Sequence, residues 1–209
     1  MYYSLWKMLE MVDHSVNRKP CMKLLKENEV LFKTVQGSTH NHQAWKGGYW
    51  DHIQEVMNIA IVLYKPLDEL RAHHFTLGEA LLVLFLHDAE KPWKYEQTPD
   101  GLRHKKYFVT KGDSHGYRMS VIAKYNIQIS SQQENAIKYV EGEHNDYTNQ
   151  RRVMNELAMF CHMCDGWSAR GWHNRPLEKN ETWGSRQFSA KADPPLAEKN
   201  KNVPITDVF

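Results

Sequence analysis

The stretch Leu81-Leu82-Val83-Leu84-Phe85-Leu86-His87-Asp88 decides how this chain folds. The run from Leu81 to Leu86 is apolar on every side, which is typical of a helix at the centre of a core. It ends in an imidazole and a carboxylate, and Lys91 follows Asp88 by about one helical turn. A buried carboxylate is costly unless a cation compensates it. We therefore expect a metal ion beside this pair and further ligands elsewhere in the chain.

The composition is that of an ordinary globular protein. The 209 residues, 41% hydrophobic and 25% charged, suffice for one domain with a sizeable core. A net charge of +2 favours neither a nucleic-acid duplex nor a membrane surface as partner, and nothing predicts the oligomeric state. We find no signal-peptide pattern and no run of roughly 18 apolar residues that could span a bilayer. The three cysteines make no disulfide framework, so we expect a cytoplasmic protein.

Helical patterning runs through most of the chain. Helices are predicted over residues 4–16, 21–34, 51–64, 113–125, 131–142 and 150–169. A further helix should open at the capping box Thr76-Leu77-Gly78-Glu79 and carry His87-Asp88.

Two other segments depart from the helical pattern. The turn signal Thr98-Pro99-Asp100-Gly101 predicts a short hairpin or irregular excursion after the His87-Asp88 segment. From about residue 179 the chain is polar, which is typical of an extended tail. We therefore expect one helical domain over residues 1–178 and a polar tail over 179–209.

Four further residues stand where a metal ligand would stand. His52 opens a predicted helix at the edge of its apolar stripe, and His115 lies on the inward face of another. His144 follows the expected end of a helix, and Asp165 lies on the inward stripe of the last one. Each histidine alone could be an ordinary hydrogen-bonded residue, and Asp165 alone could cap a turn. Their order and spacing together favour a metal site.

This order of ligands resembles the HD superfamily of metal-dependent phosphohydrolases, over roughly residues 39–170. Gly47-Gly48-Tyr49-Trp50-Asp51-His52 is similar to the segment that introduces the first histidine, and Leu86-His87-Asp88-Ala89-Glu90-Lys91-Pro92 is similar to the lysine-containing core motif. Asp165-Gly166-Trp167-Ser168-Ala169 is similar to the segment of the last aspartate. One departure is Glu90, which stands where the lysine-containing motif usually has glycine.

The resemblance implies an all-α HD-domain bundle with two divalent transition-metal ions, from among iron, manganese, cobalt, nickel and zinc. One metal would be bound by His52, His87 and Asp165. The other would be bound by His115 and His144, and Asp88 would bridge both. The implied activity is hydrolysis of a phosphoester, phosphodiester or phosphoanhydride bond of a nucleotide by a metal-activated hydroxide.

Other residues near these motifs are candidates for catalysis and substrate binding. Asp88, Lys91 and Arg118 are the catalytic candidates, the last two as cations that stabilise phosphoryl oxygens. His42, Trp45, Tyr49 and Lys94 are candidates for contacting a nucleotide through stacking, hydrogen bonds or charge. The alternatives are a salt bridge from Lys91 to Asp88, packing of the aromatic rings in the core, and solvated surface lysines.

Two other functions fit the same residues. Some HD proteins use such a ligand set in a mixed-valence diiron oxygenase acting on a small polyol or phosphonate. A non-catalytic nucleotide-binding module is the other alternative, although binding alone would not require a full set of ligands.

Overall fold

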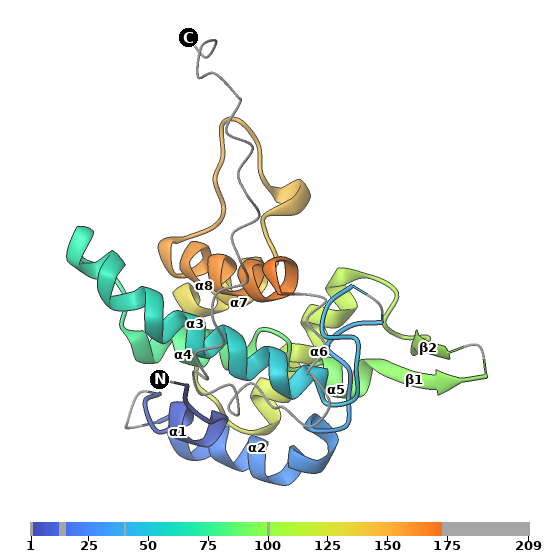
Figure 1. Cartoon of the computed structure of the whole chain (residues 1–209). Coiled ribbons are helices and arrows are strands. Elements are labelled where there is room, and N and C mark those ends of the chain that lie inside the picture. The colour runs from blue at the N-terminus through green and yellow to red at the C-terminus, as the bar shows by residue number, and fades with distance from the viewer. Residues whose placement is uncertain (1, 13–15, 40, 100, 173–209) are drawn as a thin grey trace, which may run out of the picture.

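The computed structural model describes residues 2–12, 16–39, 41–99 and 101–172, and we discuss only these. The fold is mostly helical with a single two-stranded sheet among the described residues, which confirms the all-α expectation in its general form (Figure 1). The predicted domain boundary at residue 178 and the tail over 179–209 lie outside the described residues. No helix in the described ranges is both long enough and apolar enough to cross a membrane.

The elements follow one another in a simple order. The α-helices are α1 (Leu5–Leu9), α2 (Arg18–Phe32), α3 (Gly48–Leu70), α4 (Leu77–Leu86), α5 (Lys91–Lys94), α6 (Lys111–Lys124), α7 (Ser131–Tyr139) and α8 (Glu156–Gly166). A 3-10 helix, η1 (His144–Asp146), follows α7, and a π-helix, η2 (Trp167–Gly171), continues α8. The strands β1 (Tyr95–Thr98) and β2 (Gly101–His104) lie between α5 and α6.

Helix α4 lies at the centre of the core, as its apolar sequence predicts. Every residue from Ala80 to Leu86 is buried. The helix packs against α3, α7 and α8, and in Figure 1 α3 and α4 lie between the α1–α2 pair and the α7–α8 pair. Its capping box is present, with the Thr76 side chain accepting from the Glu79 backbone and the Glu79 side chain accepting in return. The His87-Asp88 segment thus begins at the buried end of a rigid central helix.

The bounds of several helices differ from the prediction for identifiable reasons. Helix α1 ends at Leu9, and α2 begins before Pro20 because proline is tolerated in a first turn, where backbone N–H groups need no helical partner. The spacing of Ser131 and Glu134 predicts a capping box for α7, but Ser130 and Gln133 form it, one residue earlier. The last helix begins only at Glu156, where the Asn155 side chain caps it by accepting from the Ala158 N–H.

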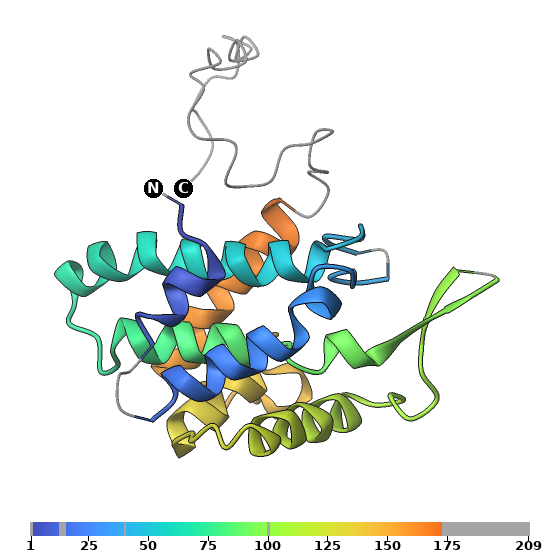
Figure 2. The same cartoon turned by 90° about the horizontal axis from the view of Figure 1, so that it is seen from below.

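The predicted hairpin is confirmed. Strands β1 and β2 pair antiparallel, with Tyr95 opposite His104 and Thr98 opposite Gly101. The hairpin projects from the bundle between α5 and α6, as both Figure 1 and Figure 2 show. Its base brings Lys94 and His104 to one wall of a pocket described below.

Candidate metal centre

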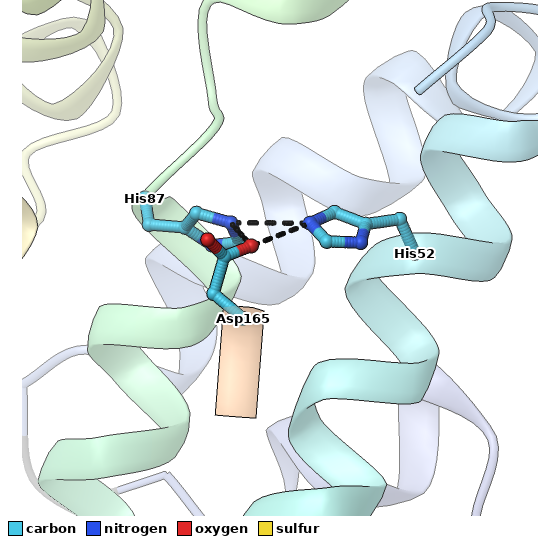
Figure 3. Close-up of side chains that lie close together, drawn as sticks. All are labelled: His52, His87 and Asp165. Atoms are coloured by element: carbon cyan, nitrogen blue, oxygen red, sulfur yellow. Dashed lines mark hydrogen bonds and ion pairs between the residues drawn. The ribbon is translucent and has the colours of Figure 1, made fainter. Parts of the chain in front are cut away.

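Three side chains from distant parts of the chain meet at the end of α4. His52 lies in the second turn of α3, His87 caps the C-terminus of α4, and Asp165 lies in the last turn of α8. Each offers one ligand atom, and these atoms all lie within 4.8 Å of one another (Figure 3). Within the described ranges this is the only group of three or more histidine, cysteine or acidic side chains with such spacing.

The distances show how closely the donor atoms converge. His52 Nε2 lies 3.4 Å from His87 Nε2 and 3.1 Å from Asp165 Oδ1. His87 Nε2 lies 3.5 Å from the same carboxylate oxygen. Asp88 Oδ2 adds a fourth donor, 3.5 Å from His52 Nε2 and 3.2 Å from His87 Nε2. Both carboxylates therefore lie close to the two imidazoles, and Asp165 completes the group of three whose ligand atoms are all within 4.8 Å of one another.

Hydrogen bonds fix which nitrogen of each imidazole carries the proton. His87 Nδ1 lies 2.7 Å from the Leu84 carbonyl oxygen, which only accepts, so Nδ1 must donate. The Ser168 hydroxyl donates to Glu55, so it accepts from His52 Nδ1 at 3.0 Å. In both neutral rings Nε2 is therefore the bare nitrogen. Two lone pairs 3.4 Å apart repel each other unless a proton or a metal ion lies between them.

A buried hydrogen-bond network contacts the Nδ1 side of His52, and its residues were not predicted from the sequence. Glu55, Ser168 and Gln43 are all buried, and Gln43 Nε2 donates to Glu55 Oε2 at 3.1 Å. Gln43 Nε2 also lies 3.1 Å from the Ser168 hydroxyl oxygen. Such outer partners orient a metal-binding histidine and raise its basicity. One signal was available, because Glu55 is a carboxylate on the inward face of α3, three residues after His52.

The paired glycines before α3 bring Gln43 to this network. Gly47 has a φ of 85°, a left-handed conformation that side chains rarely adopt, and it caps the helix N-terminus. A Cβ atom on Gly48 would lie 1.8 Å from the Gln43 carbonyl oxygen. Only glycine therefore allows the loop to pass so close to the helix that carries His52.

The charges at the centre are nearly balanced by the protein itself. Lys91 Nζ lies 2.6 Å from Asp88 Oδ2, and both side chains are buried. Burial alone would raise the pKa of Asp88, but Lys91 and His87 hold it well below its usual value. Burial likewise opposes protonation of His87, yet the Asp88 and Asp165 carboxylates raise its pKa to about 10. Burial keeps the pKa of His52 below its usual value.

Asp88 keeps one oxygen that the protein does not satisfy. Neither of its buried oxygens has a hydrogen-bond partner among the residues that the structure describes, and the ion pair with Lys91 compensates only Oδ2. A buried carboxylate oxygen left without a partner is costly, so it indicates a ligand that is held when the site is in use.

The donor group opens into a pocket of about 740 Å³. Asp165 lines this pocket, together with Lys91 and His42. The other residues around this pocket are Asn41, Lys111, Glu141, His144, His162, Gly166, Ala169 and Arg170. We call it the metal-side pocket. Its basic lining suits a negatively charged ligand.

The structure does not bring His115 and His144 to the other expected ligands. His115 lines a neighbouring pocket of about 480 Å³, which we call the side pocket, and His144 lines both pockets. His144 Nε2 accepts a hydrogen bond from Lys111 Nζ at 2.7 Å. His115 Nδ1 is buried without a hydrogen-bond partner among the described residues. Neither belongs to the group that could hold a metal.

Arg118, expected to contact phosphate, is instead held by the protein. Its Nε and Nη2 atoms donate to the two Glu90 carboxylate oxygens at 2.8 and 3.1 Å, and Nη1 donates to the Ile137 carbonyl oxygen. Both charged side chains are buried. The ion pair with Arg118 therefore explains why Glu90 stands where the family motif usually has glycine.

The four candidates for substrate contact are placed differently from one another. His42 lines the metal-side pocket and Lys94 lines the side pocket. Trp45 Nε1 donates to Asp51 Oδ2 at 2.8 Å. Tyr49 is only 1% exposed and packs edge-on against Phe32, because its position on α3 faces the core. Its ring therefore has no face open to a nucleobase, which corrects the expectation of stacking.

Comparison of the chain with protein-family models, with curated proteins and with solved structures found no match. The geometry of the site is therefore the only basis for assigning a function.

Proposed function

We propose that this protein is a metal-dependent phosphohydrolase of the HD type that acts on a nucleotide. One observation carries the proposal. Hydrogen bonds on the far side of both rings direct His52 Nε2 and His87 Nε2 toward each other, 3.4 Å apart and beside two carboxylates. This is a ligand set that divalent transition metals prefer.

The donors fit one metal ion better than two. His52, His87 and Asp165 would hold the first ion, with Asp88 beside them, and the unsatisfied Asp88 Oδ1 offers a further donor. A second ion held by His115 and His144 has no such support, because these side chains do not join the group. Metal analysis of the purified protein therefore has to show whether the second ion expected from the sequence is present.

The protein residues around the centre have roles that suit phosphate chemistry. A bound divalent metal supplies an acidified water and neutralises phosphoryl charge. Lys91, held beside Asp88, lines the metal-side pocket and can donate to a non-bridging phosphoryl oxygen. Burial and the charge of Lys91 lower the pKa of His42 to about 4, so His42 is neutral at physiological pH and acts as a hydrogen-bonding group.

The first test is metal analysis of the purified full-length protein, followed by a phosphate-release assay over a panel of nucleotides with added manganese, cobalt or nickel. We expect metal in the protein and release of phosphate. Asp88→Ala should lose both metal and activity. Lys91→Met should keep the metal and lower turnover at least tenfold, by the order of one charged hydrogen bond. Lys124→Met, an exposed lysine on α6, is the control for a lost charge.

The other outcomes discriminate between the functions. Two iron ions with oxygen consumption and no phosphate release would favour the diiron oxygenase. Nucleotide binding without metal or turnover would favour the binding module. Full activity of Asp88→Ala would refute the metal centre, and a protein that stays metal-free would indicate that a proton on His87 balances the charges.

A further inference from the structure

The side pocket adjoins the metal-side pocket and shares a wall with it. Lys111, Glu141 and His144 line both. The side pocket is otherwise bounded by the base of the hairpin, through Lys94 and His104, and by α6 and the segment after α7. The two pockets are therefore neighbours along these three residues.

Two of the four carboxylates of the side pocket form ion pairs within the protein, and a third accepts hydrogen bonds from the backbone. Glu90 is paired with Arg118, and Asp146 accepts from Lys138 Nζ at 2.9 Å. Glu143 accepts from the backbone N–H groups of residues 153 and 154 at 2.8 and 2.9 Å. The negative charge of these groups is thus satisfied without any ligand.

Two lysines keep their charge for a ligand. Lys111 donates to His144 Nε2, an acceptor that carries no negative charge and so does not compensate the lysine charge. Lys94 has no carboxylate within ion-pair distance among the residues that the structure describes. His104 lies near Lys94, since burial and then the Lys94 charge lower its pKa. The remaining carboxylate, Glu141, lies near Lys91 and Arg118. Burial lowers the pKa of these two groups, their closer partners raise it more strongly, and Glu141 raises it further.

We propose that the side pocket binds a second phosphate group of the substrate through Lys94 and Lys111, so that the enzyme acts on nucleotides carrying more than one phosphate. The inference rests on the proposed function for the position of the first phosphate. The buried and unsatisfied His115 Nδ1 is a further group that a phosphate oxygen would satisfy. A strongly hydrated ammonium without a carboxylate partner is a common ligand for phosphate.

The test compares two ligands across four forms of the full-length protein. Calorimetry at constant ionic strength gives dissociation constants for adenosine 5′-monophosphate and for adenosine 5′-(α,β-methylene)diphosphate, whose bridge resists hydrolysis. The forms are the wild type, Lys94→Met, Lys111→Met and the control Lys106→Met, an exposed lysine that lines neither pocket. The measured quantity is the ratio of the two dissociation constants, because effects common to both ligands cancel.

We expect the wild type and Lys106→Met to bind the diphosphate at least tenfold more tightly than the monophosphate, and Lys94→Met and Lys111→Met each to lower that preference about tenfold. Adenosine 3′,5′-bisphosphate, as a third probe, shows whether the second phosphate belongs to a phosphate chain or to the sugar.

The inference is overturned if the wild type shows no preference, if both pocket variants keep it, or if Lys106→Met loses it equally. Failure of the proposed function would show separately, as absent metal and absent turnover, whereas the ratio of dissociation constants requires neither.

Discussion

At the scale of single residues, the site depends on the protonation state that the protein imposes on two histidines. A helical sequence pattern does not indicate which nitrogen of an imidazole carries the proton. The Leu84 carbonyl oxygen holds a proton on His87 Nδ1, and the Ser168 hydroxyl holds one on His52 Nδ1. The first contact is local and the second joins residues more than a hundred positions apart, so only the folded structure shows the second.

We predict that Ser168→Ala lowers metal affinity about 10- to 100-fold, the usual effect of removing an outer partner of a metal ligand. The substitution removes the acceptor for His52 Nδ1 and leaves the proton position of the ring unfixed. Competition with a chromogenic chelator measures the affinity. Ser120→Ala, on the exposed side of α6, is the matched control. If the metal affinity of Ser168→Ala stayed within about twofold of the wild type, the role assigned to Ser168 would be contradicted.

His42 gives a prediction about pH. The unfolded chain protonates this histidine below about pH 6.5, whereas the folded chain resists protonation until about pH 4. The free energy of unfolding should therefore fall as the pH falls through this window, by about 1–2 kcal/mol between pH 7 and pH 5. Urea unfolding of the wild type and of His42→Gln measures it, because the variant has no titration at this position. Equal pH dependence of the two proteins would show that His42 is not held neutral.

The sequence identified the donor residues but not their surroundings. His52, His87 and Asp165 could be predicted because each interrupts or borders an apolar stripe that must face the core. Ser168 could not, because it lies in the π-helix that continues α8, where α-helical periodicity no longer gives the direction of a side chain. The expectation that Tyr49 contacts a nucleotide was wrong. The sequence around an aromatic residue does not show whether its ring stacks on a ligand or packs in the core.

At the scale of elements, the Glu90–Arg118 pair joins the segment after α4 to α6 and, through the Ile137 carbonyl oxygen, to α7. The sequence analysis identified Arg118 as a candidate cation but could not supply its partner, which lies 28 positions earlier. The same limit applies to helix ends. The capping box of α4 could be predicted from the sequence. The capping box of α7 was predicted one residue too late, because Ser130 and Ser131 are both possible caps.

We predict that Arg118→Met destabilises the protein by about 3–5 kcal/mol, because it leaves the Glu90 charge buried and unpaired. The double variant Glu90→Met with Arg118→Met should recover most of this loss, since both charges are then gone. Urea unfolding of the two single variants and the double variant gives the coupling energy.

The exposed hairpin pair supplies the control for this cycle. Arg103 Nε lies 2.8 Å from Glu96 Oε1, with the arginine exposed and the glutamate partly exposed. Arg103→Met should therefore cost less than about 1 kcal/mol. A stable but inactive Arg118→Met would instead restore the sequence-based expectation that Arg118 contacts phosphate.

At the scale of the whole molecule, the three donors come from α3, the end of α4 and α8, which are far apart in the sequence and packed together in the core. A bound metal would therefore connect the middle of the fold to its last described helix. Local patterning predicted the helices and the hairpin, but this convergence follows from tertiary packing and was expected only from the family resemblance.

We predict that this connection makes the stability of the entire fold depend on metal. A ligand that binds only the folded state at 100 times its Kd adds about 2.7 kcal/mol to the free energy of unfolding. For a protein of this size that shift raises the Tm by roughly 5–11 °C. Thermal unfolding with and without EDTA should show this difference in the wild type and lose it in Asp165→Asn. His162→Ala, which alters the metal-side pocket outside the donor group, should keep it. An equal response of the wild type and Asp165→Asn would mean that metal stabilises the protein somewhere other than this centre.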